Sequence, residues 1–372
     1  MSSHVAVPPA LDDLLAQLVR GETVDAGAED VAALGHRAIA HGVEALVSAR
    51  LRGQQDVAPA LFEAFRDLEA AAGVASALQD RELRRVLDAI GRKGIEVLIV
   101  KGAALAHTDY PEPHLRPRVD TDLLVRRHDL EPLTALLATV GYRPSARIST
   151  GELVSHQRAF EFRDPRGMQH VLDVHWRLAN PQVFAAELDE LPLFETAVPV
   201  PALGAVARTT VLVERLLLCT IHRLAHHQGR ERLIWLHDMD LLARRASADD
   251  WKEVVRLASV RRMRAVCLSG LLRAQEAFGT PLPEGDVRSL RVPGESEPSA
   301  VWVRSQQRPL DVLQADLRVL PSWRLRLRLL REHAFPPPAF VLDRYRVHRR
   351  AWLPALYAHR LMTGLWKWLI AR

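Results

Sequence analysis

The chain has 372 residues, enough for about two or three domains, with 48% hydrophobic and 26% charged residues and a net charge of +5. This balance excludes an intrinsically disordered chain and predicts a protein with a sizeable buried core. Two cysteines, Cys219 and Cys267, exclude a disulfide-rich fold and fit a reducing compartment. No apolar run reaches the roughly 18 residues of a membrane span, and no signal-peptide pattern is visible, so we expect a cytoplasmic protein.

Residues 1–94 are predicted to form an N-terminal helical region. Apolar residues recur there at the spacing of one helix face, and glycines and prolines separate the stretches. Two such stripes are Leu11, Leu14, Leu15 and Leu18, and Leu83, Val86, Leu87 and Ile90.

Residues 95–205 are predicted to form a mixed α/β core. Short apolar, β-branched runs predict strands, and a helix is expected at about 129–140 because Gly141 follows it. The last two strands are joined by a four-residue turn at 164–167, which predicts a hairpin. The predicted strands are 95–100, 119–125, 159–163 and 169–176.

The remainder of the chain is predicted to be mostly helical. We expect a helical domain at 206–280, a linker at 281–300 that is rich in Gly, Pro, Ser and Glu, and a basic helical region at 301–372. The sequence thus predicts an α+β fold, in which a small mixed β-sheet core is flanked by N-terminal helices and a mostly helical C-terminal region.

The last 72 residues hold 14 Lys and Arg against 4 Asp and Glu. Such a region suits RNA, an acidic membrane surface or a protein partner, but a solvated helical surface has the same composition. Its notable residues are Arg344, Arg346, His348, Arg349, Arg350, Trp352, Trp366 and Trp368.

The strand at 119–125 carries the first candidate site residues, Asp120 and Asp122. Residues two apart in a strand point to the same face, so their carboxylates are expected side by side, while Leu123 and Val125 face the core. Two such carboxylates repel each other unless a cation lies between them. Mg²⁺ suits this position because it binds through one or two carboxylates and substrate phosphates.

A third carboxylate, Asp173, interrupts an otherwise apolar strand. A lone Asp is costly to bury without a partner, so we expect it to join the first two if the strands are neighbours. Three carboxylates can hold two metal ions about 4 Å apart, an arrangement used in phosphoryl transfer.

Lys101 and Gly102 stand where the first predicted strand gives way to a helix. A glycine there lets the backbone approach a phosphate, and the helix start offers free N–H groups. The lysine adds a cationic donor for the same phosphates. A turn glycine beside a surface lysine is the alternative.

Taken together, these motifs resemble the uncharacterised bacterial nucleotidyltransferase family of the DNA polymerase β-like superfamily. The resemblance spans about residues 30–245. It rests on Lys101-Gly102, Tyr110, Leu115-Arg116-Pro117, Asp120-x-Asp122, Gly141-Tyr142, Asp173-Val-His175-Trp176, His222 with His226, and Arg232-Leu-Ile-Trp235 with Asp238.

The resemblance implies a role for each matching residue. Asp120 and Asp122 would bind the metal ions, and Asp173 would bind the catalytic metal and help to deprotonate the attacking hydroxyl. Gly102, with Lys101, would contact the β- and γ-phosphates, where the wider superfamily usually has Gly-Ser. Arg116 would be a phosphate ligand or a structural partner of the cluster.

The histidines allow more than one interpretation. His175 shares the strand face of Asp173, so it either contacts nucleotide or metal or is a hydrogen-bonded structural residue. His222 and His226, four residues apart on a helix, suit a substrate cleft, a zinc site or structural hydrogen bonds. Asp238 is expected near the same cleft, paired with one of these histidines or with Arg232.

The sequence therefore predicts an enzyme that uses Mg²⁺ or Mn²⁺ and transfers a nucleoside monophosphate from a nucleoside triphosphate (NTP) to a hydroxyl group. The acceptor would be a small molecule, a peptide or a protein. Two alternatives remain: a toxin-like enzyme that modifies RNA or tRNA, and a non-catalytic nucleotide-binding protein.

Overall fold

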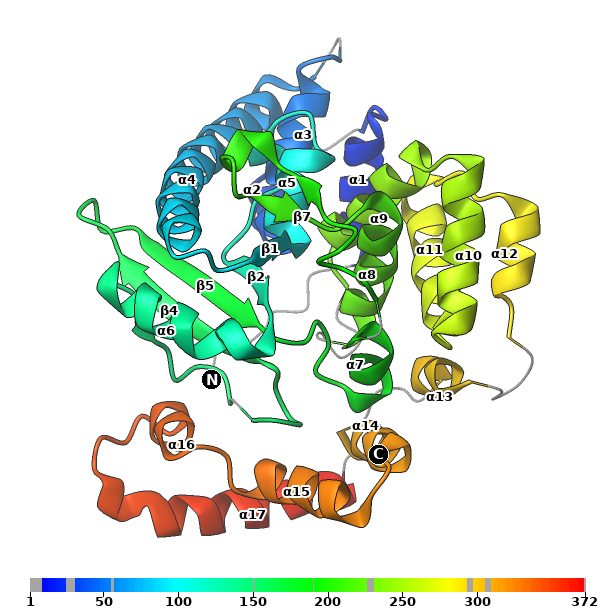
Figure 1. Ribbon diagram of the computed structural model, residues 1–372. Helices are drawn as coiled ribbons and strands as arrows, with labels where there is room; N and C mark the ends of the chain where they lie inside the picture. The colour runs from blue at the N-terminus through cyan, green and yellow to red at the C-terminus, as the bar shows by residue number, and fades with distance from the viewer. Residues whose placement is uncertain are drawn as a thin grey trace.

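The computed structural model shows an α+β protein in which helices surround one small sheet (Figure 1). It describes residues 9–24, 31–54, 57–149, 151–189, 191–225, 231–292, 297–304 and 309–370. The α+β prediction from the sequence is confirmed.

Four helices precede the sheet, as the apolar stripes predict. They are α1 (Pro9–Arg20), α2 (Val31–His41), α3 (Glu44–Leu51) and α4 (Pro59–Arg92). The 34-residue helix α4 begins with a proline at its first turn, where the missing N–H costs no helical hydrogen bond. Leu83, Val86 and Leu87 near its C-terminal end are buried against the sheet.

The main sheet has the order β1-β2-β5-β4-β3. Strands β2 and β5 run parallel, and every other neighbouring pair is antiparallel. The strands are β1 (Val97–Val100), β2 (Thr121–Val125), β3 (Arg143–Pro144), β4 (Gln157–Arg163) and β5 (Gln169–His175). In the predicted hairpin between β4 and β5, Asp164 accepts the backbone N–H groups of Arg166 and Met168, each at 2.9 Å.

Short helices and strands either connect the strands of the sheet to one another or follow β5 and lead to the helices beyond it. They are α5 (Lys101–Thr108), η1 (Pro113–Leu115), η2 (Arg127–Asp129), α6 (Leu130–Thr139), α7 (Gln182–Asp189), β6 (Val198–Pro199), η3 (Pro201–Leu203) and β7 (Arg208–Thr209). Strands β6 and β7 pair with each other as a separate two-stranded ribbon.

The two faces of the sheet belong to different parts of the core, because side chains alternate along a strand. Ile99, Leu123 and Val125 pack with α4 and α6. Leu98 and Leu124 pack instead with the large helical core. The sheet is therefore covered on both faces.

A bundle of helices packs beside the sheet (Figure 1). Its members are α8 (Leu212–Ala225), α9 (Leu233–Arg245), α10 (Ala248–Val260), α11 (Arg264–Phe278) and α12 (Glu284–Leu290). Ser247 and Asp250 form a capping box that fixes the start of α10. Gly279, with φ +62°, ends α11 in the left-handed conformation that favours glycine.

The expected linker at 281–300 differs from the structure in its described part. Residues 284–290 form α12, which packs on α10 and α11, and Leu290 is fully buried. The Gly, Pro and Ser content of the segment predicted a linker, but its described part includes a short helix whose last residue, Leu290, packs in the core.

The basic C-terminal region forms a layer along one side of the molecule (Figure 1). It consists of α13 (Pro298–Arg304), α14 (Pro309–Val319), α15 (Trp323–Ala334), α16 (Pro338–Arg344), η4 (Arg350–Trp352) and α17 (Leu353–Ile370). Trp302 packs edge-on against Phe184 of α7, with ring centroids 5.5 Å apart. Asp316 accepts the Val183 N–H at 3.3 Å, and Glu332 accepts the Leu153 N–H at 2.8 Å.

In the described part of the chain, no helix is both long enough and apolar enough to span a membrane.

Asp316 makes the stability of this C-terminal attachment depend on pH. Burial raises the pKa of Asp316 to about 7 in the folded protein, far above its ordinary value of 3.8. The folded state therefore favours the protonated form, so its contribution to stability is lost as pH rises from about 4 through about 7. We expect Asp316→Asn to exceed the wild type in unfolding free energy at pH 8 by roughly 2–4 kcal/mol.

Thermal and urea unfolding at pH 5 and pH 8 would measure this difference. The exposed Asp249, substituted in the same way, should change stability by less than about 0.5 kcal/mol at either pH. Equal pH dependence in Asp316→Asn and wild type would contradict the prediction.

Candidate functional site

The strand register brings the predicted carboxylates together. Val100 is the Cα partner of Asp122 across the antiparallel β1–β2 pair. Asp122 is in turn the partner of Asp173 across the parallel β2–β5 pair. Residues in register on neighbouring strands project to the same face. Two acidic side chains 51 positions apart in the sequence therefore lie side by side, next to the end of β1.

Asp122 is the charge-compensated member of the cluster. Its Oδ1 accepts a hydrogen bond from Lys101 Nζ at 2.6 Å and lies 2.7 Å from His175 Nε2. Burial acts to raise the pKa of Asp122, but Lys101 and His175 outweigh it and hold that pKa well below its ordinary value. Asp122 is therefore a carboxylate at neutral pH.

Asp173 and Asp120 are in the opposite electrostatic situation. Burial, followed by the charges of Asp122 and Asp120, raises the pKa of Asp173 to about 7. Burial and Asp122 likewise raise the pKa of Asp120 to about 6. Asp173 Oδ2 accepts a hydrogen bond from Gln157 at 3.3 Å, while its buried Oδ1 has no hydrogen-bond partner in the described chain. Among the described residues, neither of these two carboxylates has a cation within salt-bridge distance, whereas Asp122 has Lys101.

One compact group of possible metal ligands lies in this cluster. An oxygen of Asp122, an oxygen of Asp173 and a ring nitrogen of His175 are all within 4.8 Å of one another. Asp120 precedes β2, which starts at Thr121, and lies outside this compact group while lining the same cavity. The structure therefore places His175 beside Asp122 and Asp173, two of the acidic residues that the sequence predicts to lie together.

His175 lies behind the carboxylates, fully buried. Burial, and then the charge of Lys101, lowers the pKa of His175, so the ring is neutral. A neutral ring 2.7 Å from a carboxylate donates its Nε2–H to Asp122. The residue therefore orients Asp122.

Lys101 adopts an unusual backbone conformation. Its φ of +55° lies in the left-handed region, which costs of order 1 kcal/mol or more for a residue with a side chain. It follows β1 directly and is the first residue of α5. This conformation accompanies the contact between Nζ and Asp122.

The close approach of Arg116 favours glycine at position 102. A Cβ atom at Gly102 would lie 3.3 Å from Arg116 Nη1, tighter than most contacts of this kind. Arg116 in turn binds Asp238 through two hydrogen bonds of 2.8 Å and donates to the Pro117 carbonyl at 2.9 Å. The Arg116 guanidinium therefore binds protein groups, the Asp238 carboxylate and the Pro117 carbonyl.

The expected pairing of Asp238 with Arg232 or a histidine is wrong. Asp238 binds Arg116, and the Tyr110 hydroxyl donates to its Oδ1 at 2.7 Å. Both acidic oxygens are therefore satisfied by residues that precede β2. This contact joins the start of the sheet to α9, which the sequence spacing could not reveal.

A cavity of about 360 Å³ lies over the cluster. Its walls come from the sheet on one side and from α8 and α9 on the other. Its lining includes Lys101, Gly102, Arg116, Asp120, Asp122, Asp173, His222 and Asp238 from the sequence prediction, together with Arg118, Gln157, Asn180, Arg215, Cys219, Arg232 and Trp235.

The remaining predicted residues line the cavity, lie on the surface of the C-terminal region or fall outside the described residues. His222 lines the cavity and meets Trp235 edge-on, with ring centroids 5.5 Å apart. His226 lies outside the described residues. Arg344, Arg346 and the other basic residues of 344–350 are exposed, and none of the described cavity lining comes from 301–370.

Sequence reasoning missed the contribution of Arg232 and Trp235 to this cavity. The available signal was the spacing of Arg232, Trp235 and Asp238 at three-residue steps, which puts them on one side of a helix. Which side of α9 faces the sheet depends on the packing of the bundle, so the spacing alone could not assign them.

Comparison with known proteins identifies the family. Among curated proteins, none matches the chain. The model of a family described as "Uncharacterised nucleotidyltransferase" matches residues 27–279, about two thirds of the chain. That range contains every residue of the acidic cluster and the cavity. The chain therefore belongs to this family of uncharacterised nucleotidyltransferases, which are transferases of phosphorus-containing groups.

Proposed function

We propose that this protein transfers a nucleoside monophosphate from an NTP to a hydroxyl group at the cluster of Asp120, Asp122 and Asp173. The observation that carries the proposal is the buried pair of in-register carboxylates, one of which has an oxygen without a partner in the described chain. Such a pair is poorly stable without a cation and well suited to one.

The donor set fits a hard divalent cation, Mg²⁺ or Mn²⁺. Asp173 Oδ1 is an unpartnered buried oxygen, and the neighbouring carboxylates raise the pKa of Asp173 by their negative charge. In this proposal Asp120, Asp122 and Asp173 hold the metal. When bound, it would neutralise charge that develops on the transferred phosphate.

In this proposal other side chains bind the phosphates, position the loop before β2 and accept the proton. Lys101 and the start of α5 bind the terminal phosphates, while Arg116 keeps Gly102 and the loop before β2 in place. Asp173 accepts the proton of the acceptor hydroxyl, whose oxygen forms a bond to the α-phosphorus. The bond between that phosphorus and the α–β bridging oxygen breaks, and pyrophosphate leaves.

The acceptor in this proposal is a small molecule, a peptide or a protein. Residues 95–205 supply the catalytic groups, and residues 206–280 supply the opposite wall of the cavity. The basic C-terminal residues do not line the described cavity, so nothing in it favours RNA over a smaller acceptor.

The first test compares the wild type with Asp173→Asn and Asp122→Asn. Both variants should lose metal-dependent nucleotide binding and nucleotide transfer. In the wild type, an NTP with Mg²⁺ should raise the melting temperature more than either alone. Each variant should lose this effect, and transfer of α-labelled NTP to acceptors in a cell extract should fall about 10³-fold, because each loses several kcal/mol of transition-state stabilisation.

Asp173→Asn separates function from folding. It removes repulsion from Asp122 and Asp120, so without metal its melting temperature should equal or exceed that of the wild type. Asp249→Asn, at an exposed position on α10, is the matched control. No response of the wild type to any of the four common NTPs would reject the proposal, and a labelled product sensitive to ribonuclease would shift the acceptor to RNA.

Lys101→Ala should make the fold depend on a divalent cation. The substitution removes the ammonium 2.6 Å from Asp122 and leaves buried like charges, a loss of about 3–5 kcal/mol for a broken buried pair. Mg²⁺ or Mn²⁺ should therefore raise the melting temperature of this variant more than that of the wild type. Lys252→Ala, at an exposed lysine, is the control, and equal metal responses in both would contradict the prediction.

A further inference from the structure

Five cationic side chains line the described part of the cavity, and four of them have a carboxylate partner. These four pairs are Lys101 with Asp122, Arg116 with Asp238, Arg118 with Asp80 and Arg215 with Asp109. The fifth, Arg232, pairs with no carboxylate in the part of the chain that the structure describes. Among the described cations of the cavity, Arg232 is the one with no carboxylate within salt-bridge distance.

Arg232 is held in a partly desolvated position in spite of having no such partner. Its buried Nε has no hydrogen-bond acceptor among the described residues. The guanidinium lies 5.7 Å from the Trp235 ring centroid, and a Cβ atom at Gly42 would come within 2.8 Å of its Nη2. Burial, followed by the charge of Arg116, lowers the pKa of Arg232. Three carboxylates beyond salt-bridge distance act on this pKa in the opposite direction, those of Glu44, Asp120 and Asp238. A charge in this environment is costly until an anion meets it.

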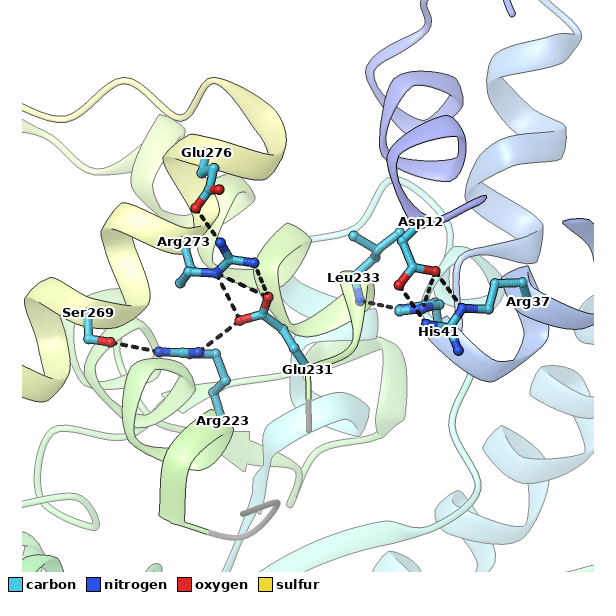
Figure 2. Close-up of polar contacts among 9 residues, drawn as sticks. All are labelled: Asp12, Arg37, His41, Arg223, Glu231, Leu233, Ser269, Arg273 and Glu276. Atoms are coloured by element: carbon cyan, nitrogen blue, oxygen red, sulfur yellow. Dashed lines mark hydrogen bonds and ion pairs between the residues drawn. The ribbon is translucent and has the colours of Figure 1, made fainter. Parts of the chain in front are cut away.

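The residues on either side of Arg232 are fixed firmly (Figure 2). On one side, Glu231 accepts hydrogen bonds from Arg223 at 2.8 Å and from Arg273 at 2.6 Å. Arg223 also donates to Ser269 at 2.8 Å, which ties the segment to α11.

On the other side, the Leu233 N–H donates to His41 Nδ1 at 3.1 Å (Figure 2). His41 Nε2 lies 3.1 Å from Asp12, which also binds Arg37 at 2.5 Å. The start of α9 is thus anchored to α1 and α2 as well as to α8 and α11. These contacts fix the backbone of Arg232, while none of the described carboxylates pairs with its guanidinium, as expected for a preorganised binding residue.

We propose that Arg232 binds the phosphate tail of the nucleoside triphosphate, opposite the metal-binding carboxylates. This assignment rests on the proposed function, because that reaction brings one polyanion to the cavity. The planar guanidinium can bind two phosphate oxygens at once, which a lysine cannot do.

The test uses Arg232→Gln and Arg232→Lys in the full chain, with Arg256→Gln as the control. Arg256 is an exposed arginine of α10 whose partner is Glu253 on the same helix. Binding of ATP, GTP, CTP and UTP, of AMP and of inorganic tripolyphosphate is measured by calorimetry with Mg²⁺. For the NTP that binds best, KM and kcat are measured as well.

Arg232→Gln should weaken NTP and tripolyphosphate binding about 10- to 100-fold, the value of charge-assisted hydrogen bonds, and leave AMP binding unchanged. KM for the NTP should rise by a similar factor, and Arg232→Lys should restore part of the loss. Without ligand, Arg232→Gln should melt no lower than the wild type, since it removes a buried charge that lacks a partner.

The outcomes separate this assignment from the proposed function. Unchanged NTP and tripolyphosphate affinities in Arg232→Gln, with transfer intact, would overturn the assignment and leave the transfer reaction standing. Tripolyphosphate binding that requires Arg232 in a protein that transfers no nucleotide would support the anion site and reject the proposed function. A wild type that binds neither NTP nor tripolyphosphate would reject both.

Discussion

The parallel pairing of β2 with β5 places Asp122 directly beside Asp173, so two buried carboxylates repel each other. The neighbouring side chains compensate the charge of only one of them. Lys101 supplies one positive charge to Asp122, and the buried neutral ring of His175 supplies a hydrogen bond from behind. Lys101 holds its place with a left-handed backbone, where most residues with side chains are disfavoured. Asp173 receives no comparable compensation from the described chain, so the electrostatics of the sheet support the proposed cation-binding site.

Buried ion pairs then hold the helical wall of the cavity over the sheet. Arg116 and Asp238 form a two-point contact, and Tyr110 satisfies the same carboxylate. Asp109 plays a similar part farther along, since Arg215 and Arg245 both bind it. Separating the two members of such a pair would leave an uncompensated buried charge and destabilise the fold, so the folded protein keeps them together. These pairs fix the position of α8 and α9 relative to the sheet. They also neutralise Arg116 and Arg215, two of the arginines that line the cavity.

The C-terminal layer is attached through fewer and more local contacts. Trp302, Asp316 and Glu332 connect it to α7 and to the segment before β4. Its exposed face combines arginines with large apolar side chains, including Trp323 and Trp352. None of the described lining of the cavity belongs to this layer, so its surface chemistry and the chemistry of the acidic cluster are separate properties of the chain.

The sequence by itself determined the elements and the type of chemistry. Apolar periodicity predicted most of the helices but not α12, and the β-branched runs predicted β1, β2, β4 and β5. The costly placement of Asp120, Asp122 and Asp173 indicated a cation site. These signals depend on neighbours within a few residues. Only the tertiary structure decided which side chains pair. How α9 packs over the sheet decides that Arg116 binds Asp238 and that Arg232 has no carboxylate partner among the described residues. The contact of His175 with Asp122 depends instead on the pairing of β2 with β5. Such contacts join residues more than 50 positions apart, and no local pattern encodes which of several arginines will reach a given carboxylate.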